Sequence, residues 1–182
     1  MARATIFHQL HDVGIAAWFG GTLANAVALN PAAAASGSPS NAGAVANAGW
    51  DRWTPVNAAA IGAHLVGAAG LLKHDFGRLR AQNGVPTMAV TKTALTVAAL
   101  GVTGYSRLLG RKVSQHSAVP VSDGTTPGPA TPPEVAAAQK QLTVLQWTIP
   151  VLTGAITAIG AYASEQYRPE EVTKGVVQRL LP

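Results

Sequence analysis

The sequence predicts an all-α integral membrane protein, with four transmembrane helices in a bundle and a short C-terminal amphipathic surface helix. Three observations support this prediction. Of the 182 residues, 48% are hydrophobic and only 12% are charged, which is about half the charge of an ordinary soluble domain. The charged residues are clustered and leave four long apolar runs between them. The composition also excludes a disordered chain, because disordered chains are rich in charge and poor in apolar residues.

Each apolar run is close to the ~20 residues that a helix needs to cross ~30 Å of hydrocarbon. Backbone groups inside a bilayer have no water to bond with, which favours helices over open strands. We therefore expect spans at about residues 6–29, 55–72, 86–106 and 142–164. A signal peptide over residues 1–35 is the alternative for the first run, but Asp12 and two histidines would lie in its basic leading region.

The remaining residues are assigned to linkers and to the surface helix. Residues 30–53 and 110–131 are rich in Ala, Ser, Gly, Thr and Pro, and are expected to be flexible linkers on the same side of the bundle. Residues 169–181 begin with a proline and two glutamates. Apolar side chains then recur on one helical face, at Val172, Val176, Val177, Leu180 and Leu181. Such a helix lies on a membrane surface or on a partner.

Prolines mark the expected helix boundaries. Thr54 followed by Pro55 predicts the start of the second span, because proline suits the first helical position. The run from Thr131 to Glu134 has the residue types of a capping box and predicts that the last long helix begins near Pro132. Pro150 lies inside that helix and should kink it.

Charge and cysteine content exclude several classes of protein. The chain has no cysteine, which excludes disulfides, zinc–thiolate sites, iron–sulfur clusters and cysteine nucleophiles. Its net charge of +5 is typical of the basic flanks of membrane spans, and no nucleic-acid partner is expected. Lysine and arginine are slightly more frequent on the N-terminal side of the membrane, which favours a cytoplasmic N-terminus.

Two charges fall inside the expected spans. Asp12 and Lys92 both lie ~10 Å from the same membrane face when helices rise 1.5 Å per residue. An ion pair or a proton or quinone site is therefore possible, and ionisable groups within a membrane are commonly functional. The alternative is that both residues lie at the interface, with Lys92 extending toward the headgroups.

Two histidines also lie at similar depth on the first two spans. His11 and His64 have a spacing that would suit a bis-histidine b-type haem between two helices. The alternative is that each imidazole bonds to a neighbouring hydroxyl or carbonyl group. No other metal site is expected.

Small residues recur at intervals of four along the spans. In lipid, rows of small residues let helices approach closely, so they predict either a tight bundle or docking against another subunit. The rows are Gly20, Ala24 and Ala28; Ala59, Ala63 and Gly67; Ala94 and Ala98; and Gly154 and Ala158.

No enzyme motif is present. The sequence has no glycine-rich phosphate loop, metalloprotease HExxH or GxSxG element, so no catalytic residue is expected. The first hypothesis is a non-catalytic accessory or stabilising subunit of a larger membrane complex, with lipids and other membrane subunits as partners. The second is a small membrane redox protein that binds haem b or a quinone. The third is a small transporter or copper-handling protein.

One short pattern in the first span resembles a known family. His11, Trp18 and the pair Gly20-Gly21 resemble the opening of the first helix in small four-helix membrane families such as the copper-resistance protein D type. The chain contains only Met1 and Met88 as methionines and has no multi-histidine copper site, so copper transport is not carried over.

The whole chain resembles small Ala- and Gly-rich actinobacterial membrane proteins with four spans, most distinctively from His8 to Asn30. Such proteins include accessory factors of the cytochrome bcc–cytochrome oxidase respiratory supercomplex. This resemblance implies an association factor of the respiratory chain without a redox centre of its own. It also implies respiratory cytochromes as partners, in a bacterial plasma membrane.

Overall fold

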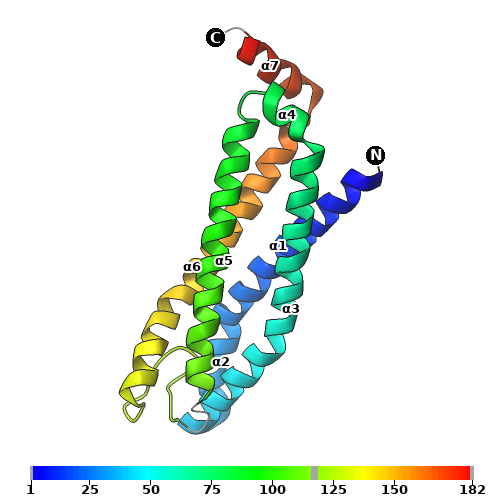
Figure 1. Ribbon diagram of the computed structural model, residues 1–182. Helices are drawn as coiled ribbons and strands as arrows, with labels where there is room; N and C mark the ends of the chain where they lie inside the picture. Colours follow the sequence, from blue (N-terminus) through cyan, green and yellow to red (C-terminus); the bar gives the residue numbers. More distant parts are fainter. Residues whose placement is uncertain (1, 116–118, 181–182) are drawn as a thin grey trace.

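The computed structural model describes residues 2–115 and 119–180 and confirms the all-α membrane fold. Long helices lie side by side in an elongated bundle, with both chain ends at one end of it (Figure 1). Within the described residues, four helices are long and apolar enough to cross a membrane. We call the end that carries α4 (Phe76–Ala81) and α7 (Pro169–Leu180) the terminal end. The opposite end, with residues 30–38 and 119–132, is the loop end.

The first helical rod is longer than its predicted span. Helix α1 (Ala2–Ala24) continues through one π-helical segment, η1 (Asn25–Leu29), into the short α2 (Asn30–Ala33) and η2 (Ala34–Ser36). The Asn25 side chain donates to the Gly21 carbonyl at 2.9 Å, which satisfies an acceptor beside the wider turn. Gly37 then ends the rod with a φ of +88°, a conformation that favours glycine.

Helix α3 (Pro39–His74) shows that the predicted linker 30–53 is wrong. Ser38 caps this helix, because its side-chain oxygen accepts from the Asn41 N–H at 3.2 Å, and a proline follows at the first helical position. Pro55 lies inside the helix, not at its start. An alanine-rich segment propagates a helix well once it is capped, so only residues 37–38 separate the two rods.

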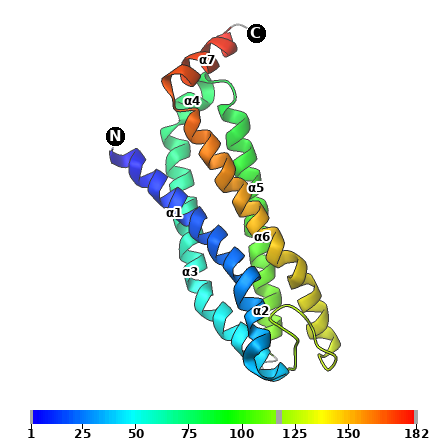
Figure 2. The ribbon, with the colours of Figure 1, turned by 180° about the vertical axis from the view of Figure 1, so that it is seen from behind.

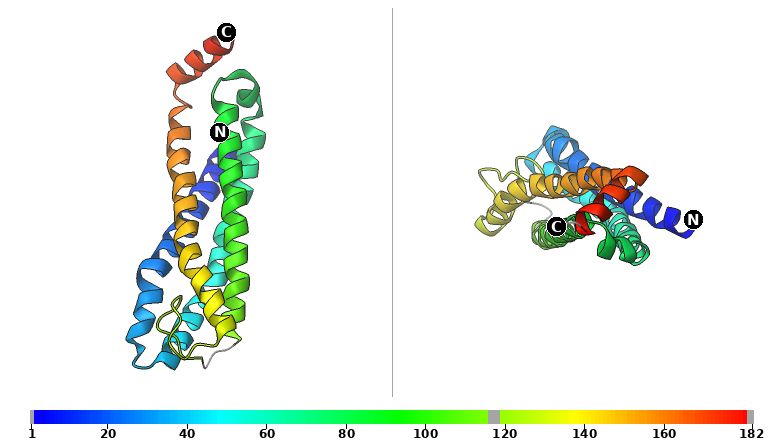
Figure 3. Two further views of the ribbon diagram at one scale, coloured as in Figure 1. Left: turned by 90° about the vertical axis from the view of Figure 1, so that its left-hand side faces the viewer. Right: turned by 90° about the horizontal axis from the view of Figure 1, so that it is seen from above.

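Helix α5 (Val85–Ser114) and helix α6 (Pro133–Glu165) form the other half of the bundle. Helix α6 begins at the predicted place and bends about halfway along its length, which is where Pro150 lies in the chain (Figure 3). The predicted capping box does not form, because the Thr131 hydroxyl donates to the Pro120 carbonyl at 2.6 Å instead.

The predicted linker 110–131 is also shorter than expected, since α5 continues to Ser114. The described part of the connection, from residue 119, is held by its own hydrogen bonds. The Asp123 carboxylate accepts from the backbone N–H groups of Thr125 and Thr126, each at 2.8 Å. An isolated β-bridge joins Val121 to Pro127. Both connections lie at the loop end, as the sequence predicts (Figure 1).

The bundle consists of two closely packed pairs of helices. Helix α1 crosses α3 along most of its length, and α5 packs along α6 (Figure 2). The two pairs meet mainly through α1 and α6, whereas α3 and α5 barely touch. Buried side chains at the α1–α5–α6 junction form the core: Ile15, Trp18, Ala99, Ile149 and Ile156. The gap between α3 and α5, here called the seam, is where cavities form.

The C-terminal helix α7 packs on the turn that follows α4. Gly175 is buried there, and its carbonyl accepts from the Asn83 N–H at 3.0 Å. Val172 and Val176 are half-buried, while Val177 and Leu180 are exposed. Leu181, which the sequence placed on the same face, lies outside the described residues.

Candidate functional site

The polar residues predicted inside the spans meet at one place. A cavity of about 300 Å³ occupies the terminal-end half of the seam. His11 and Asp12 reach it from α1, His64 from α3 and Lys92 from α5. We call it the histidine cavity. Thus all four of these residues, which come from three helices, line one space, and α6 closes it with Gly160 and Ala163.

Asp12 pairs with its neighbour in the chain. Its carboxylate lies 2.7 Å from His11 Nδ1, and the Asp12 side chain is largely exposed while His11 is buried. In the described part of the chain, Asp12 and Lys92 do not approach within ion-pair distance. Lys92 is half-buried and lines the cavity from α5.

His64 is bonded to the protein through both ring nitrogens. Its Nδ1 lies 3.3 Å from the His11 carbonyl oxygen, and its Nε2 lies 3.5 Å from the Thr96 hydroxyl. The rings of His11 and His64 contact each other, with centroids 4.5 Å apart. His64 therefore matches the alternative to haem ligation, in which neighbouring hydroxyl and carbonyl groups form hydrogen bonds to a buried imidazole.

The geometry does not fit a haem between these two histidines. Their rings touch, so no space for a macrocycle separates them. The helices that carry them are also in backbone contact. A methyl group on Gly14 would lie 2.5 Å from the backbone nitrogen of His64, and one on Gly67 would overlap the backbone nitrogen of His11.

Some residues of the predicted small-residue rows pack inside the bundle, and the others lie on its surface. Gly67 is buried against α1, and a methyl on Gly154 would lie 3.1 Å from the Phe19 ring. Ala63 is half-buried. The other members lie on the exposed surface of the bundle: Gly20, Ala24, Ala28, Ala59, Ala94, Ala98 and Ala158.

Gly67 belongs to a predicted row, but three further close helix contacts involve glycines outside those rows. Gly14 packs on α3, Gly21 lies under the Trp53 ring, and Gly70 lies against the Phe7 ring. Each glycine faces a backbone or an aromatic ring, so a four-residue repeat of small residues does not reveal them. For Gly21 and Gly70, the signal in the sequence would have been a glycine on one helix at the same depth as an aromatic residue on the neighbouring helix.

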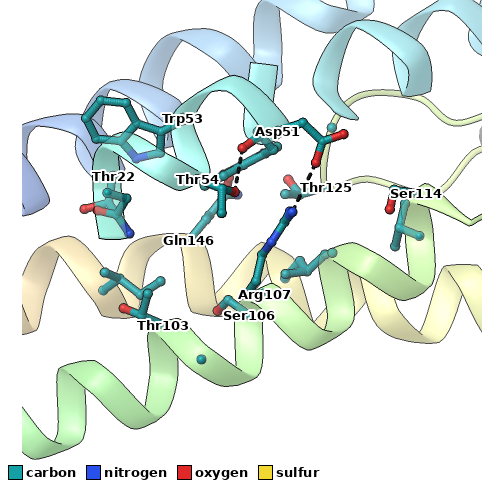
Figure 4. A pocket seen from close by; sticks show the side chains of 18 of the residues that line it. Thr22, Asp51, Trp53, Thr54, Thr103, Ser106, Arg107, Ser114, Thr125 and Gln146 are labelled. Atoms are coloured by element: carbon teal, nitrogen blue, oxygen red, sulfur yellow. Dashed lines mark hydrogen bonds and ion pairs between the residues drawn. The ribbon is translucent and has the colours of Figure 1, made fainter. Parts of the chain in front are cut away.

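A second cavity was not predicted from the sequence. It has a volume of about 330 Å³ and occupies the loop-end half of the seam (Figure 4). Arg107 from α5 pairs with Asp51 from α3 at 3.1 Å on its wall. We call it the loop-end cavity. Thr103, Ser106 and Arg107 share one face of α5, which is a three- and four-residue spacing that a sequence search could have noticed.

A polar clamp holds α7 and α4 beside the histidine cavity. The Tyr167 hydroxyl donates to the Asp75 carboxylate, and the Arg78 guanidinium lies 3.7 Å from the centre of the Tyr167 ring. Arg78 also donates to the Gln166 carbonyl at 2.8 Å. Burial, and then the Asp75 carboxylate, raise the pKa of Tyr167 above its ordinary value. All three side chains line the mouth of the histidine cavity.

Comparison with protein-family models, curated proteins and solved structures gives no match for this chain. The fold and the sites define a small multi-pass α-helical membrane protein with two polar-walled cavities along one seam of its bundle.

Proposed function

We propose that this protein is a non-catalytic accessory subunit of a larger membrane complex. The supporting observation is a row of small residues on the outer face of the first helical rod. Ala16, Gly20, Ala24, Ala28 and Ala32 recur every four residues, and all five are exposed. From the first to the last, this row extends ~24 Å along the helix at 1.5 Å per residue.

A row of this kind is suited to a helix of another subunit. Apolar side chains gain nothing by leaving lipid for one another, so helices associate in membranes through close packing. The row is continuous with a shallow depression between the first rod and α3, which includes Leu29, Gly49 and Trp53. A partner helix could lie along the row with its side chains in this depression.

The resemblance of the sequence directs the proposal to a respiratory complex in a bacterial plasma membrane. Respiratory cytochromes are then the partners, and the N-terminus is cytoplasmic according to the distribution of lysine and arginine.

The test is purification of the tagged full-length chain from native membranes in a mild detergent. Mass spectrometry and a visible spectrum of the eluate would identify any partner. We expect membrane subunits in a fixed ratio to the tagged chain, with the absorption bands of cytochromes. Recovery of the chain alone, under conditions that keep known complexes of the same membrane intact, would contradict the proposal.

A second candidate function is binding of a quinone in the histidine cavity. It is favoured by the convergence of His11, Asp12, His64 and Lys92 on one space. The Lys92 ammonium group can donate hydrogen bonds to the carbonyl oxygens of a quinone ring. Leu65, Leu72 and Met88 supply apolar walls for the ring and its tail.

Quinone binding has an optical test, because the Trp18 ring lies 6.3 Å from the His64 ring. Quinones quench tryptophan fluorescence at short range, so a quinone beside His64 need not touch the buried Trp18 ring. Titration of the detergent-solubilised chain with decylubiquinone or a short-chain menaquinone should give saturable quenching. Quenching that rises linearly, as with free tryptophan in detergent, would contradict this candidate.

A further inference from the structure

The loop-end cavity lies at the edge of the hydrocarbon region. On α3, twenty residues without Asp, Glu, Lys or Arg separate Arg52 from Lys73. At 1.5 Å per residue they span ~30 Å, the thickness of the hydrocarbon core. Arg52 therefore marks the loop-side boundary, and the neighbouring Asp51–Arg107 pair lies at the same level. On the loop-end side of this boundary, α3, α5 and α6 extend outside the hydrocarbon region.

Several residues that line this cavity carry a buried polar atom without a hydrogen-bond partner. Within the part of the chain that the structure describes, there are five such atoms. They are Trp53 Nε1, Asn57 Oδ1, Thr103 Oγ1, Ser106 Oγ and Arg107 Nε. Buried polar groups without partners are rare in native proteins and indicate a missing ligand or solvent.

These unpaired groups are mainly donors. The indole N–H of Trp53 and the Nε–H of Arg107 can only donate, and the hydroxyls of Thr103 and Ser106 can donate as well. Asn57 contributes the single carbonyl-type acceptor. A ligand that satisfies the set must therefore carry several acceptor oxygens. A phosphodiester with adjacent ester or hydroxyl groups has this pattern.

Charge at the loop end favours an anion. Arg52, Arg107, Arg111, Lys112 and Lys140 outnumber the acidic residues Asp51, Asp123 and Glu134. Asp51 occupies one terminal nitrogen of Arg107, at 3.1 Å, but the Nε–H of the same guanidinium has no partner. Arg107 can therefore hold Asp51 and a ligand oxygen at once, because its five N–H donors form a planar fork.

The rest of the cavity is suited to hydrocarbon. Ile61, Leu100, Leu142 and Ile149 line its inner walls. Ala58 on α3 and Gly104 on α5 are lining residues that are also exposed, so the cavity opens sideways between the two helices. A molecule with acyl chains can thus enter from the bilayer and lie along the seam.

We propose that the loop-end cavity binds an anionic glycerophospholipid. Its phosphodiester accepts hydrogen bonds from Ser106, Trp53 and the Arg107 Nε–H, and its acyl chains lie along the seam toward Leu100. This site is independent of the accessory-subunit proposal, because it opens between α3 and α5 and requires no protein partner, although Trp53 also borders the depression beside the small-residue row.

The test is native mass spectrometry of the delipidated full-length chain in detergent. The probes are palmitoyl-oleoyl phosphatidylglycerol, the diacylglycerol with the same chains, and inorganic phosphate. We expect one phosphatidylglycerol to remain bound at collision energies that remove the diacylglycerol. Inorganic phosphate should not compete. Circular dichroism and the gel-filtration volume would confirm that every variant is folded.

Two pairs of variants localise the binding. Replacing Arg107→Gln removes the free donor and should weaken phosphatidylglycerol binding about tenfold, whereas Arg111→Gln, one turn further along α5 and exposed, removes the same charge outside the cavity. Gly104→Leu fills the opening, whereas Gly101→Leu adds the same side chain to the same helix away from the cavity. A Cβ at either glycine meets no neighbouring atom within 4 Å, so both variants should fold.

Three results would overturn the proposal: equal retention of diacylglycerol and phosphatidylglycerol, displacement of the lipid by inorganic phosphate, or unchanged lipid binding in Gly104→Leu. The first would show that the phosphate is not recognised. The second would show that an ion, not a lipid, is the ligand. The third would place the bound lipid elsewhere on the protein.

Discussion

Gly14 and His64 are in backbone contact where α1 crosses α3, and a methyl group on Gly14 would lie 2.5 Å from the backbone nitrogen of His64. The contact is reciprocal, because Gly67 on α3 faces the backbone nitrogen of His11 on α1. Two glycines thus let two helices approach closely and bring the two histidine rings together. The histidine cavity depends on this crossing for its shape.

Replacing Gly14→Ala should therefore destabilise the bundle. The added methyl group has no space beside the α3 backbone, and overpacking of this kind costs about 1–3 kcal/mol. The measurement is the unfolding midpoint in detergent, by circular dichroism. Gly20→Ala, six residues further along the same helix, is the control, because a Cβ there meets nothing within 4 Å. Equal midpoints for the two variants would contradict the contact.

Asn30 is expected to be important for stability at the loop end. It is buried, its side-chain N–H donates to Gln146 at 2.8 Å, and its side-chain oxygen accepts from Trp50 at 3.0 Å. Asn30→Ala breaks both bonds and leaves partly buried groups unpaired, at a cost of about 1–3 kcal/mol. The exposed Asn41→Ala should cost less. Thermal unfolding of both variants measures the difference, and a larger loss in Asn41→Ala would count against this role.

Ionisation of Tyr167 at alkaline pH should weaken the packing of α7. Its pKa is raised in the folded protein by burial and by Asp75. The unfolded tyrosine ionises near pH 10, so the stabilisation is complete below about pH 10 and is lost as the pH rises further. Hydrogen exchange of residues 169–180 at increasing pH would detect this loss.

Tyr167→Phe removes that ionisation and the hydrogen bond to Asp75. Because Tyr167 is 38% exposed, we expect a loss of only about 1 kcal/mol, together with disappearance of the alkaline step. The exposed Tyr162→Phe serves as the control. An alkaline step that survives in Tyr167→Phe would assign it to another group.

Enlarging the outward row on α1 should disrupt association without unfolding the chain. Ala24→Leu places a bulky side chain in the row, which prevents close approach of a partner helix. We expect the co-purified subunits to be lost while the unfolding midpoint stays the same. Ala98→Leu makes the same change on an exposed face of α5. If Ala24→Leu retains its partners and Ala98→Leu loses them, the docking face lies on α5 instead.

Lys92→Met should weaken quinone binding, because it keeps the length of the side chain and removes its hydrogen-bond donors. We expect the saturable quenching of tryptophan fluorescence to shift to at least about tenfold higher quinone concentration. Lys140→Met, outside the histidine cavity, removes the same charge near the loop end. Identical titrations for the two variants would leave Lys92 without a role in binding.

Hydropathy located the helices in the sequence but not their ends. The apolar runs reveal where a helix contacts lipid, whereas α3 begins sixteen residues before Pro55, in an uncharged alanine-rich segment. Composition made that segment resemble a linker. Alanine is nevertheless the strongest helix former, and the decisive signal was the cap formed by Ser38 and Pro39.

The candidate site was partly predictable for a similar reason. Depth along a helix follows from counting residues, so Asp12 and Lys92 could be placed at one level, and they do line one cavity. Which face each helix turns inward is set by packing. Gly20 and Ala24 therefore lie outside, which excludes them from the packing within the bundle and leaves docking against another subunit as the interpretation of their spacing. The loop-end cavity depends on the separation of α3 from α5, which no local pattern encodes.

Leu100 lines both the histidine cavity and the loop-end cavity, from about the middle of α5. Because this one side chain borders both cavities, a substitution that enlarges or shortens it changes the volume of both at once. The two cavities are therefore not independent in shape, although they occupy opposite halves of the seam.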